Sequence, residues 1–320
     1  MSTHSPCHGF LREDIRYPES YSRPIMWDFT CNICGQPGVF REEHCINPEL
    51  PSCSGCGSNV RFRWLVHQLS REIFGDSIPL VRFPPNSSVK GIGLSDPACI
   101  ANPLTDCFTY RNTCFHAEPH LDIRVDPSPI GDLDFLIASE VFEHIEPPVA
   151  QAFRNAATLL KPSGVLLLTV PWVWDGSEPL PELYDWKLHK EGEEWIVVNR
   201  TADEQTERFS GLSFNDGPGP SLGYTREHFP QLHQWAISQE GESRRLLNKR
   251  PDGSIEIFHN LVFHRGPGSA LEMRLFTKRG LENNLREAGF AKVEFAFEDH
   301  PEFGIIFTYP WSRPIVARLG

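Results

Sequence analysis

The chain has 320 residues, with 30 Lys and Arg against 42 Asp and Glu and a formal net charge of −12 at pH 7. This length suits one large domain or two smaller ones. The acidic balance argues against a nucleic acid as substrate, because nucleic-acid binders usually carry a basic surface. The opening MSTHSPCHGFLRED has no apolar core behind a basic start, and no apolar run approaches the roughly 20 residues of a membrane span. We therefore expect a cytoplasmic protein that does not enter the membrane.

Two C-x-x-C pairs follow a polar arm, rich in proline and tyrosine, that covers residues 1–28. The pairs are Cys31 with Cys34 and Cys53 with Cys56, and a glycine follows each pair directly. A two-residue gap with glycine after the second cysteine lets both thiolates face one ion, and zinc prefers four such ligands in a tetrahedron. We therefore predict a structural Zn²⁺ site. Four protein ligands leave the ion no open position, so we assign it no catalytic role.

Two other interpretations of these cysteines stay open. His44 and Cys45 lie between the pairs and could replace one ligand, although the symmetry of the pairs favours the four cysteines. The cysteines could also be redox-active or simply buried. In a reducing cytoplasm, however, such cysteines are more often metal ligands or small buried residues than disulfides.

An amphipathic helix is predicted after the second pair, within a module that we bound at residues 29–86. Its sequence, VRFRWLVHQLSREIF, places apolar residues at helical spacing. Four arginines give this region a basic face: Arg61, Arg63, Arg71 and Arg82. That face is either a solvated surface of a packed helix or a recognition site for an anionic substrate, which arginine would bind by bidentate pairing.

The stretch from Asp132 to Pro171 predicts a strand, a helix and a second strand. The apolar run at 134–138 has the length of a buried parallel strand, and Val-Leu-Leu-Leu-Thr-Val at 165–170 reads as another. Between them, apolar residues after Pro148 recur at the spacing of one buried helix face. The whole has the length of a right-handed parallel crossover, and doubly wound sheets bind ligands at the carboxyl ends of such strands.

Three segments of this stretch, DFLIAS, EVFEHI and LKPSGVLLLTVP, resemble the fourth strand, its loop and the fifth strand of class I S-adenosylmethionine-dependent methyltransferases. GYTREHFPQLHQW and FHNLVFHRGPGSALEMR resemble segments of a little-described bacterial branch of that family, zinc knuckles included. The resemblance covers residues 88–171 and 271–309. It implies a Rossmann-like α/β sheet, mostly parallel with an antiparallel last strand, and S-adenosylmethionine as cofactor. An N-terminal zinc-knuckle module and a large insertion after the fifth strand complete the expected fold.

The segment SVKGIG at 88–93 resembles the family's first strand and its turn. The resemblance implies that Gly91 and Gly93 lie at the cofactor, because glycine lets the backbone approach a ligand and the next helix offers N–H donors to a carboxylate. The segment also departs from the family: Gly91 stands where an acid is usual, and Ser95 and Pro97 replace two glycines. The alternative is therefore a protein that has lost S-adenosylmethionine binding.

Two acids are candidates for cofactor binding by their position. CFTYRNTCF at 107–115 alternates as a second strand would, and residues 121–123 form a short third. In the family, an acid after the second strand accepts hydrogen bonds from the ribose hydroxyls, and another near the third meets the adenine amine. Glu118 and Asp122 match these positions. The alternative for each is a solvated loop carboxylate.

The loop after the fourth strand is expected to lie where the cofactor's sulfonium meets the substrate. The resemblance places Ser139 and Glu140 there as cofactor-binding residues. His144 follows a turn later and could act as a general base, because histidine titrates near neutrality. In many relatives the same position only packs or caps.

Residues 172–270 form an insertion that we interpret as a cap over the methyl-transfer site, where loops carry substrate specificity. A hairpin is predicted around Pro251-Asp252-Gly253, with apolar residues on both arms. Four polar residues within or just after the insertion are candidates for catalysis, with a structural role as the alternative for each: Glu227, His228, His264 and Arg274.

The methyltransferase domain is expected to comprise residues 87–171 and 271–320. A helix is predicted over 277–289, where a glycine supplies the stop. Two closing strands are predicted at 293–297 and 303–308, which matches the antiparallel last pair of the family.

The function that we expect is methyl transfer from S-adenosylmethionine to an O or N atom of a small organic acceptor, as in secondary metabolism. Such transfer is an in-line displacement that depends on holding the two reactants close and aligned. One alternative is a zinc-knuckle RNA methyltransferase that uses the basic segment 61–82 as its contact. Another is a non-catalytic binding module with a methyltransferase fold. The pattern indicates neither the acceptor nor the oligomeric state.

Overall fold

The computed structural model describes residues 26–41, 50–115, 117–125, 127, 130–145, 149–173, 186–192, 194–199, 206–210, 215–216, 234–240, 243–249, 251–253, 255–258, 262–263, 271–272, 276–307 and 313–320. The chain divides into two compact units, residues 1–17 with 180–275 and residues 18–179 with 276–320. The domain boundaries expected from the sequence, which include a cap at 172–270, are not tested by this division and stay a prediction.

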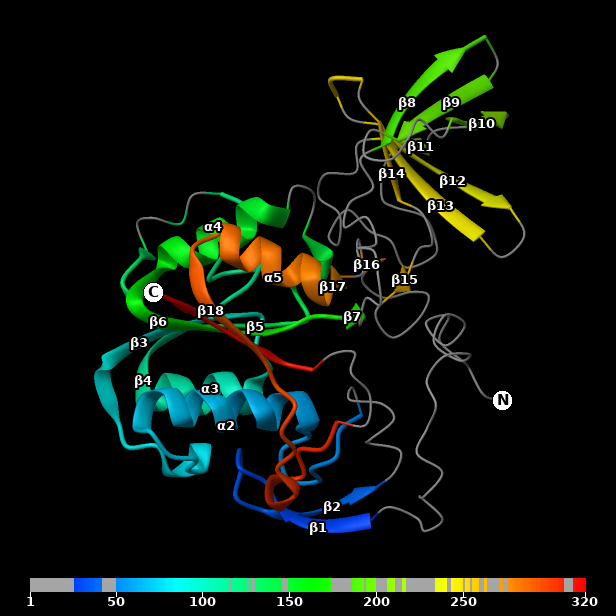
Figure 1. The fold of residues 1–320 in the computed structure, drawn as a ribbon. Helices are drawn as coiled ribbons and strands as arrows, with labels where there is room; N and C mark the ends of the chain where they lie inside the picture. Colours follow the sequence, from blue (N-terminus) through cyan, green and yellow to red (C-terminus); the bar gives the residue numbers. More distant parts are fainter. Residues whose placement is uncertain are drawn as a thin grey trace. The chain divides into compact units, whose positions relative to one another are not determined.

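The larger unit contains a six-stranded sheet whose strand order identifies its fold class (Figure 1). The strands follow one another across the sheet as β18 (Phe290–Phe295), β19 (Ile315–Leu319), β6 (Leu160–Thr169), β5 (Leu133–Ser139), β3 (Asn86–Leu94) and β4 (Phe108–Thr113). β19 is antiparallel to both of its neighbours, and the other pairs are parallel. This confirms the mostly parallel Rossmann-like sheet with an antiparallel last strand. The chain runs from β3 outward to β4 and then returns to the other side of β3 as β5. The strand order therefore reverses at β3, and we call the place between β3 and β5 the switch point.

Two of the predicted strands were wrong. Residues 121–123 do not form a third strand. The chain turns at 122–125 instead, where Val125 N donates to Asp122 O at 3.0 Å and the Asp122 side chain accepts from Arg124 N at 3.0 Å. The last strand is β19 and not 303–308. Ile305 is buried, but its backbone N–H is bonded to His300 O at 3.0 Å in a tight turn.

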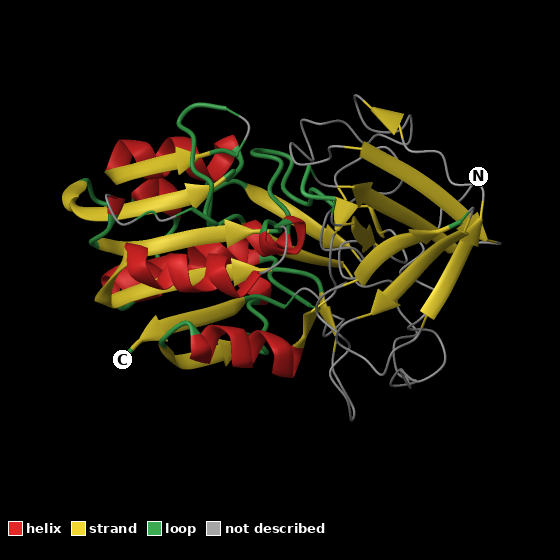
Figure 2. Ribbon diagram, turned by 90° about the horizontal axis from the view of Figure 1, so that it is seen from above, coloured by secondary structure: helices red, strands yellow, loops and turns green. Residues whose placement is uncertain are grey.

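Helices cover both faces of this sheet, as Figure 1 shows. α2 (Val60–Phe74) and α3 (Ala98–Cys107) lie on one face, where they pack with Phe135 and Ile137, and α4 (Val149–Leu159) and α5 (Lys278–Glu287) lie on the other with Leu136 and Ala138. Successive strand residues point to opposite faces, so both faces of β5 are apolar. Seen from above, the strands run side by side and the helices run along them (Figure 2).

The helices predicted by apolar spacing are confirmed, and side chains cap the N-termini of two of them. α4 and α5 occupy the predicted positions, and Thr277 Oγ1 accepts from Gly280 N at 3.0 Å at the start of α5. The Asn59 side chain accepts from Phe62 N at 3.0 Å at the start of α2. Smaller elements of the same unit are β1 (Met26–Thr30), β2 (Pro37–Arg41), β7 (Trp172–Val173), β17 (Phe276–Thr277) and the 3₁₀ turns η2 (Leu80–Arg82), η4 (Phe142–His144) and η5 (Pro301–Phe303).

The basic face predicted for α2 was wrong. Arg61 and Arg63 are 1% and 0% exposed, so two of the three arginines of α2 are inside the protein. Arg63 can be buried because protein groups accept hydrogen bonds from both of its terminal nitrogens. Arg63 donates to Ser52 Oγ and Gly304 O, both at 2.7 Å, and its guanidinium lies 4.6 Å from the centre of the Phe29 ring.

The smaller unit is built of antiparallel strands. A three-stranded sheet contains β8 (Trp186–Glu191), β9 (Glu194–Asn199) and β10 (Thr206–Ser210), and a four-stranded sheet contains β11 (Asn215–Asp216), β12 (Gln234–Glu240), β13 (Ser243–Lys249) and β14 (Ile255–Phe258). β15 (Val262–Phe263) pairs with β16 (Leu271–Glu272). The predicted hairpin around Gly253 is confirmed, because Lys249 pairs with Ile255 across it. Among the described residues, no helix is long and apolar enough to cross a membrane.

We predict that Gly91→Ala destabilises the larger unit by about 1–3 kcal/mol through overpacking. A Cβ at residue 91 would lie 2.1 Å from the Phe135 ring, so the ring would have to move. Urea unfolding should show the loss, and Phe135→Leu should recover part of it in the double variant, as a coupled pair requires. Ser87→Ala, at an exposed position of the same strand, is the control. Equal stability of Gly91→Ala and wild type would contradict the packing.

Candidate functional site

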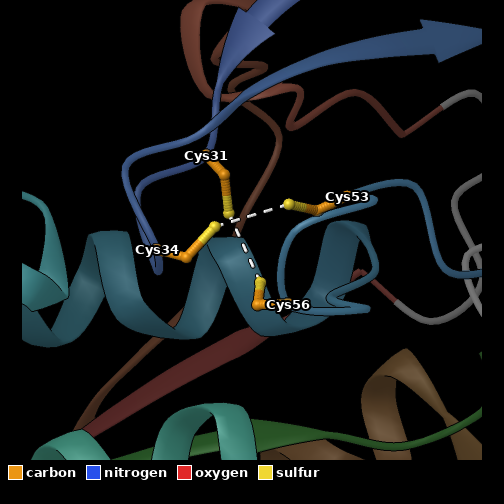
Figure 3. A group of neighbouring side chains, drawn as sticks. All are labelled: Cys31, Cys34, Cys53 and Cys56. Carbon is orange, nitrogen blue, oxygen red and sulfur yellow. Dashed lines mark hydrogen bonds between the residues drawn. The ribbon is translucent and has the colours of Figure 1, made fainter.

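The four predicted cysteines come together in one cluster. The Sγ atoms of Cys31, Cys34, Cys53 and Cys56 all lie within 4.8 Å of one another, and Figure 3 shows them pointing toward a common centre. Cys31 Sγ lies 3.8 Å from Cys56 Sγ, and Cys34 Sγ lies 3.6 Å from Cys53 Sγ. Zinc–sulfur bonds of about 2.3 Å in a tetrahedron place the sulfurs about 3.8 Å apart. Both separations match this spacing, so the four thiols fit Zn²⁺ as ligands.

The same backbone turn presents both cysteine pairs. Gly35 N donates to Cys31 O, and Gly57 N donates to Cys53 O, each at 2.8 Å. Both glycines are in the left-handed region, with φ of 75° and 70°, where a side chain would be strained. The first pair lies in the turn between β1 and β2, and the second precedes α2. His44 and Cys45 lie outside the described residues.

Without a metal ion, the surroundings of the cluster favour the protonated thiol of Cys31. Hydrogen bonding to the Cys56 thiol, followed by burial, raises the pKa of Cys31 to about 12. Four thiolates in one small volume repel one another, and a bound metal ion reverses this by stabilising the deprotonated form. The buried Arg63 guanidinium adds positive charge from one side. Its Nη1 lies 3.4 Å from Ser58 Oγ, which in turn lies 3.5 Å from Cys31 Sγ.

A second candidate site lies at the carboxyl ends of β3 and β5, where the sheet switches direction. Ser95 follows β3 with φ of 60°, and Glu140 follows β5 with φ of 54°. Left-handed backbone is uncommon for residues other than glycine and concentrates at functional sites. Ser95 N donates to Thr113 O at 2.7 Å, and Glu140 N donates to Thr169 O at 2.9 Å. The chain therefore leaves the switch point in opposite directions. After β3 it turns toward β4, and after β5 it turns toward β6.

Polar groups gather at this switch-point edge, which we define as residues 95–97 and 139–145. Ser139 Oγ lies 2.8 Å from Thr169 Oγ1 at the ends of β5 and β6. α3 starts directly after the edge, and no side chain caps its N-terminus. Its first N–H groups therefore face the edge without a side-chain acceptor, which suits an anionic group of a ligand.

The two glycines expected at the cofactor have a packing role. A Cβ at Gly91 would strike the Phe135 ring, and a Cβ at Gly93 would lie 1.9 Å from Tyr110 Oη. Glycine is therefore required at both positions by their neighbours within the protein. Contact of either glycine with a cofactor stays a prediction.

Asp96 is a buried acid that no sequence motif marks. Its Oδ2 accepts from Tyr110 Oη at 2.6 Å, and its backbone is held by both groups of the Asn112 amide at 2.9 Å. Among the described residues, Asp96 Oδ1 has no hydrogen-bond partner. Burial raises the pKa of Asp96 to about 7, although the Tyr110 hydrogen bond works in the opposite direction. The alternation of 107–115 could have placed Tyr110 inward, but it carried no sign of a buried acid.

The two acids proposed for the ribose and the adenine lie on the loop after β4. Asp122 is bound by its neighbour Arg124, whose Nη2 lies 2.6 Å from Asp122 Oδ2. Burial tends to raise the pKa of Asp122, but the hydrogen bonds from Arg124 outweigh it and the pKa lies below its usual value. Glu118 is exposed and accepts from His120 N at 3.0 Å. A role of either acid at a cofactor stays a prediction.

The residues expected near the reacting centre differ in their surroundings. Glu140 Oε1 lies 3.6 Å from Nε of the buried Arg61. The loop after β5 is therefore bound to α2. His144 Nε2 lies 3.6 Å from Oε1 of Glu143, a fully buried residue, and the His144 side chain is 23% exposed. A basic role for His144 stays a prediction. The four candidates within or just after the insertion, Glu227, His228, His264 and Arg274, lie outside the described residues.

No protein-family model matches the chain, and no curated protein matches it. Solved structures do match at low similarity. KedS8, a sugar N-methyltransferase from Streptoalloteichus sp ATCC 53650, is 12% identical with a TM-score of 0.37, over 82% of this chain and 87% of that chain. CalS10, an amino pentose methyltransferase from Micromonospora echinaspora, is 12% identical with a TM-score of 0.31, over 78% and 90%. DesVI from Streptomyces venezuelae is 13% identical with a TM-score of 0.34, over 72% and 84%. Matches this distant assign neither activity nor substrate, so the fold class rests on the strand order above.

We predict that the purified chain carries one Zn²⁺ and that Cys53→Ser loses it. The loss of one ligand should destabilise the protein by at least ~3 kcal/mol, because structural zinc binds with far more free energy than that. Metal analysis and thermal unfolding measure both effects. Cys107→Ser, which changes a cysteine outside the cluster, should keep the metal. A folded, reduced wild-type protein that takes up no zinc would contradict the assignment.

We also predict that Asp96→Asn changes how stability depends on pH. The folded protein holds a proton at Asp96 between the ordinary carboxyl pKa of 3.8 and the raised value of about 7. Wild-type stability therefore falls as pH rises through this window and levels off above it. The variant cannot ionise at this position, so its stability relative to wild type should rise by about 3 kcal/mol from pH 5 to pH 8.

Urea unfolding at several pH values measures this difference. Asp132→Asn, at an exposed acid paired with Lys90, is the matched control and should show no such growth. A stability difference between Asp96→Asn and wild type that does not change with pH would show that Asp96 does not titrate in this window.

Proposed function

We propose that the chain is an S-adenosylmethionine-dependent methyltransferase that acts on an O or N atom of a small organic acceptor. The observation that carries the proposal is the divergence of β3 and β5 at the switch point. In doubly wound sheets, ligands bind at this place, outside the carboxyl ends of the strands. Two left-handed residues, Ser95 and Glu140, mark the divergence.

The residues at the edge suit the parts of this cofactor. The N-terminus of α3, which has no side-chain cap, would receive the carboxylate of the methionine part. The hydroxyls of Ser139 and Thr169 supply neutral polar groups at the ends of β5 and β6. Asp122 would accept hydrogen bonds from the nucleoside. Its carboxylate offers more than one acceptor site, so it can do this beside Arg124 or after the Arg124 side chain moves away.

When bound, S-adenosylmethionine supplies an activated methyl group on a sulfonium. The protein then needs to hold the acceptor close to that carbon and in line with it, which alone contributes much of the rate. Glu140 and Ser139 lie on the loop that would form one wall of this space. A general base is optional for such a reaction, and His144 is the residue of this edge that the sequence suggests for that role.

The structure weakens the RNA alternative in one respect. The segment proposed as an RNA contact presented Arg61 and Arg63, and both are buried. Only Arg71 and Arg82 of that set are exposed, which leaves little of the basic surface that phosphate binding requires. The non-catalytic alternative differs from the proposal in cofactor binding, so a binding measurement separates them.

We predict that zinc-loaded protein binds S-adenosylhomocysteine with micromolar affinity and that Asp122→Ala weakens the binding. Calorimetric titration measures both. The matched control is Asp132→Ala, an exposed acid at the opposite, amino end of β5, which should bind like wild type. No binding by folded, zinc-loaded wild type would reject the methyltransferase proposal and favour the non-catalytic module.

A further inference from the structure

A buried ion pair joins the helix next to the metal cluster to the switch-point edge. Arg61 lies in the first turn of α2, and its Nε lies 3.6 Å from Oε1 of Glu140, the first residue after β5. The two side chains are 1% and 8% exposed. Removing one partner of such a pair leaves a charge in the protein interior, so each residue restricts where the other can be.

Glu140 needs such a restriction because of its backbone. Its φ of 54° is left-handed, which is unfavourable for a residue with a Cβ and persists only where the surroundings enforce it. One anchor is the bond from Glu140 N to Thr169 O at 2.9 Å. The ion pair with Arg61 is the second, on the side chain. Together they set the direction in which the chain leaves β5.

The metal cluster sets the position of Arg61. Only four residues separate it from the ligand Cys56, and three of them are tightly held. Gly57 forms the knuckle turn, Ser58 is fully buried, and the Asn59 side chain caps α2. Arg61 therefore cannot move relative to the cluster unless the turn at Cys53–Gly57 opens or the first turn of α2 unwinds.

We propose that Arg61 is a positioning residue for the switch-point edge. It holds Glu140 in its left-handed conformation, and through it the metal cluster controls the backbone at 139–145. The local effect on this loop stands by itself, whereas its consequence for ligand binding rests on the methyltransferase function proposed above. The closed zinc site thus has a functional consequence without any contact with substrate.

Hydrogen exchange of the full-length, zinc-loaded protein tests the local effect. We expect Arg61→Met to speed amide exchange in peptides covering 139–145 by roughly tenfold or more, as the loss of a local anchor should. Arg61→Lys, which keeps the charge, should have a smaller effect. Arg71→Met, at an exposed arginine of the same helix, should have none. Removal of zinc by a chelator should speed exchange in the same peptides of wild type.

A second variant keeps the test valid if Arg61→Met does not fold. Glu140→Gln keeps the side-chain shape and removes the charge, and zinc content with circular dichroism reports whether each variant is folded. The double variant Arg61→Met with Glu140→Gln leaves no unpaired charge, so it should exchange more slowly at 139–145 than Arg61→Met alone. Unchanged exchange at 139–145 in folded Arg61→Met or Glu140→Gln would overturn the proposal.

S-adenosylhomocysteine binding tests the functional consequence. If wild type binds, Arg61→Met should lower the affinity by roughly tenfold with little change in zinc content, and the double variant should recover part of it. Equal affinity of Arg61→Met and wild type would overturn the role of Arg61 in ligand binding. If wild type does not bind, the methyltransferase proposal fails, and the exchange experiment still decides whether Arg61 positions the loop.

Discussion

Two guanidinium groups buried on one helix constrain the whole larger unit. A buried charge is tolerated only where partners satisfy it, and neither Arg61 nor Arg63 finds its partners on α2 alone. Arg63 needs the hydroxyl of Ser52 and the carbonyl of Gly304, which lies 241 residues away in sequence. Arg61 needs Glu140 at the end of β5. α2 therefore reaches its buried position only when the cysteine module, the sheet and the C-terminal segment are all in place.

Elements with a strong local pattern could be predicted from the sequence, and elements chosen by distant partners could not. The apolar runs and helical spacing between 133 and 169 identified β5, α4 and β6 because burial on both faces leaves few polar residues. The basic face of α2 failed because nothing local distinguishes an arginine in water from one bonded to Gly304. The final strand failed for the same reason: 303–308 and 315–319 are both short apolar segments, and only pairing with β6 selects the second.

The candidate sites show the same difference between local patterns and distant partners. The cysteine cluster was predictable because its ligands and turn glycines are local and metal geometry demands them. The switch-point edge was located from the strand order, but its particular features were hidden. Nothing in the sequence indicates that Ser95 and Glu140 are left-handed, since neither is a residue that favours this region. Gly93 appeared to mark a ligand, whereas the Tyr110–Asp96 pair already requires it to lack a side chain.

The cysteine cluster and the left-handed backbone at the switch-point edge are connected through α2. A residue such as Glu140 keeps its unfavourable backbone only if a rigid body holds it, and a loop that hydrogen-bonds only to itself would relax. The Zn²⁺ predicted for these cysteines would be a compact source of rigidity in a segment that has little core of its own, since β1 and β2 are short and mostly exposed. The first turn of α2 carries that rigidity to the sheet. Under the positioning role proposed for Arg61, a metal site without an open coordination position would act on the switch-point edge by supplying a fixed point rather than a reactive ion.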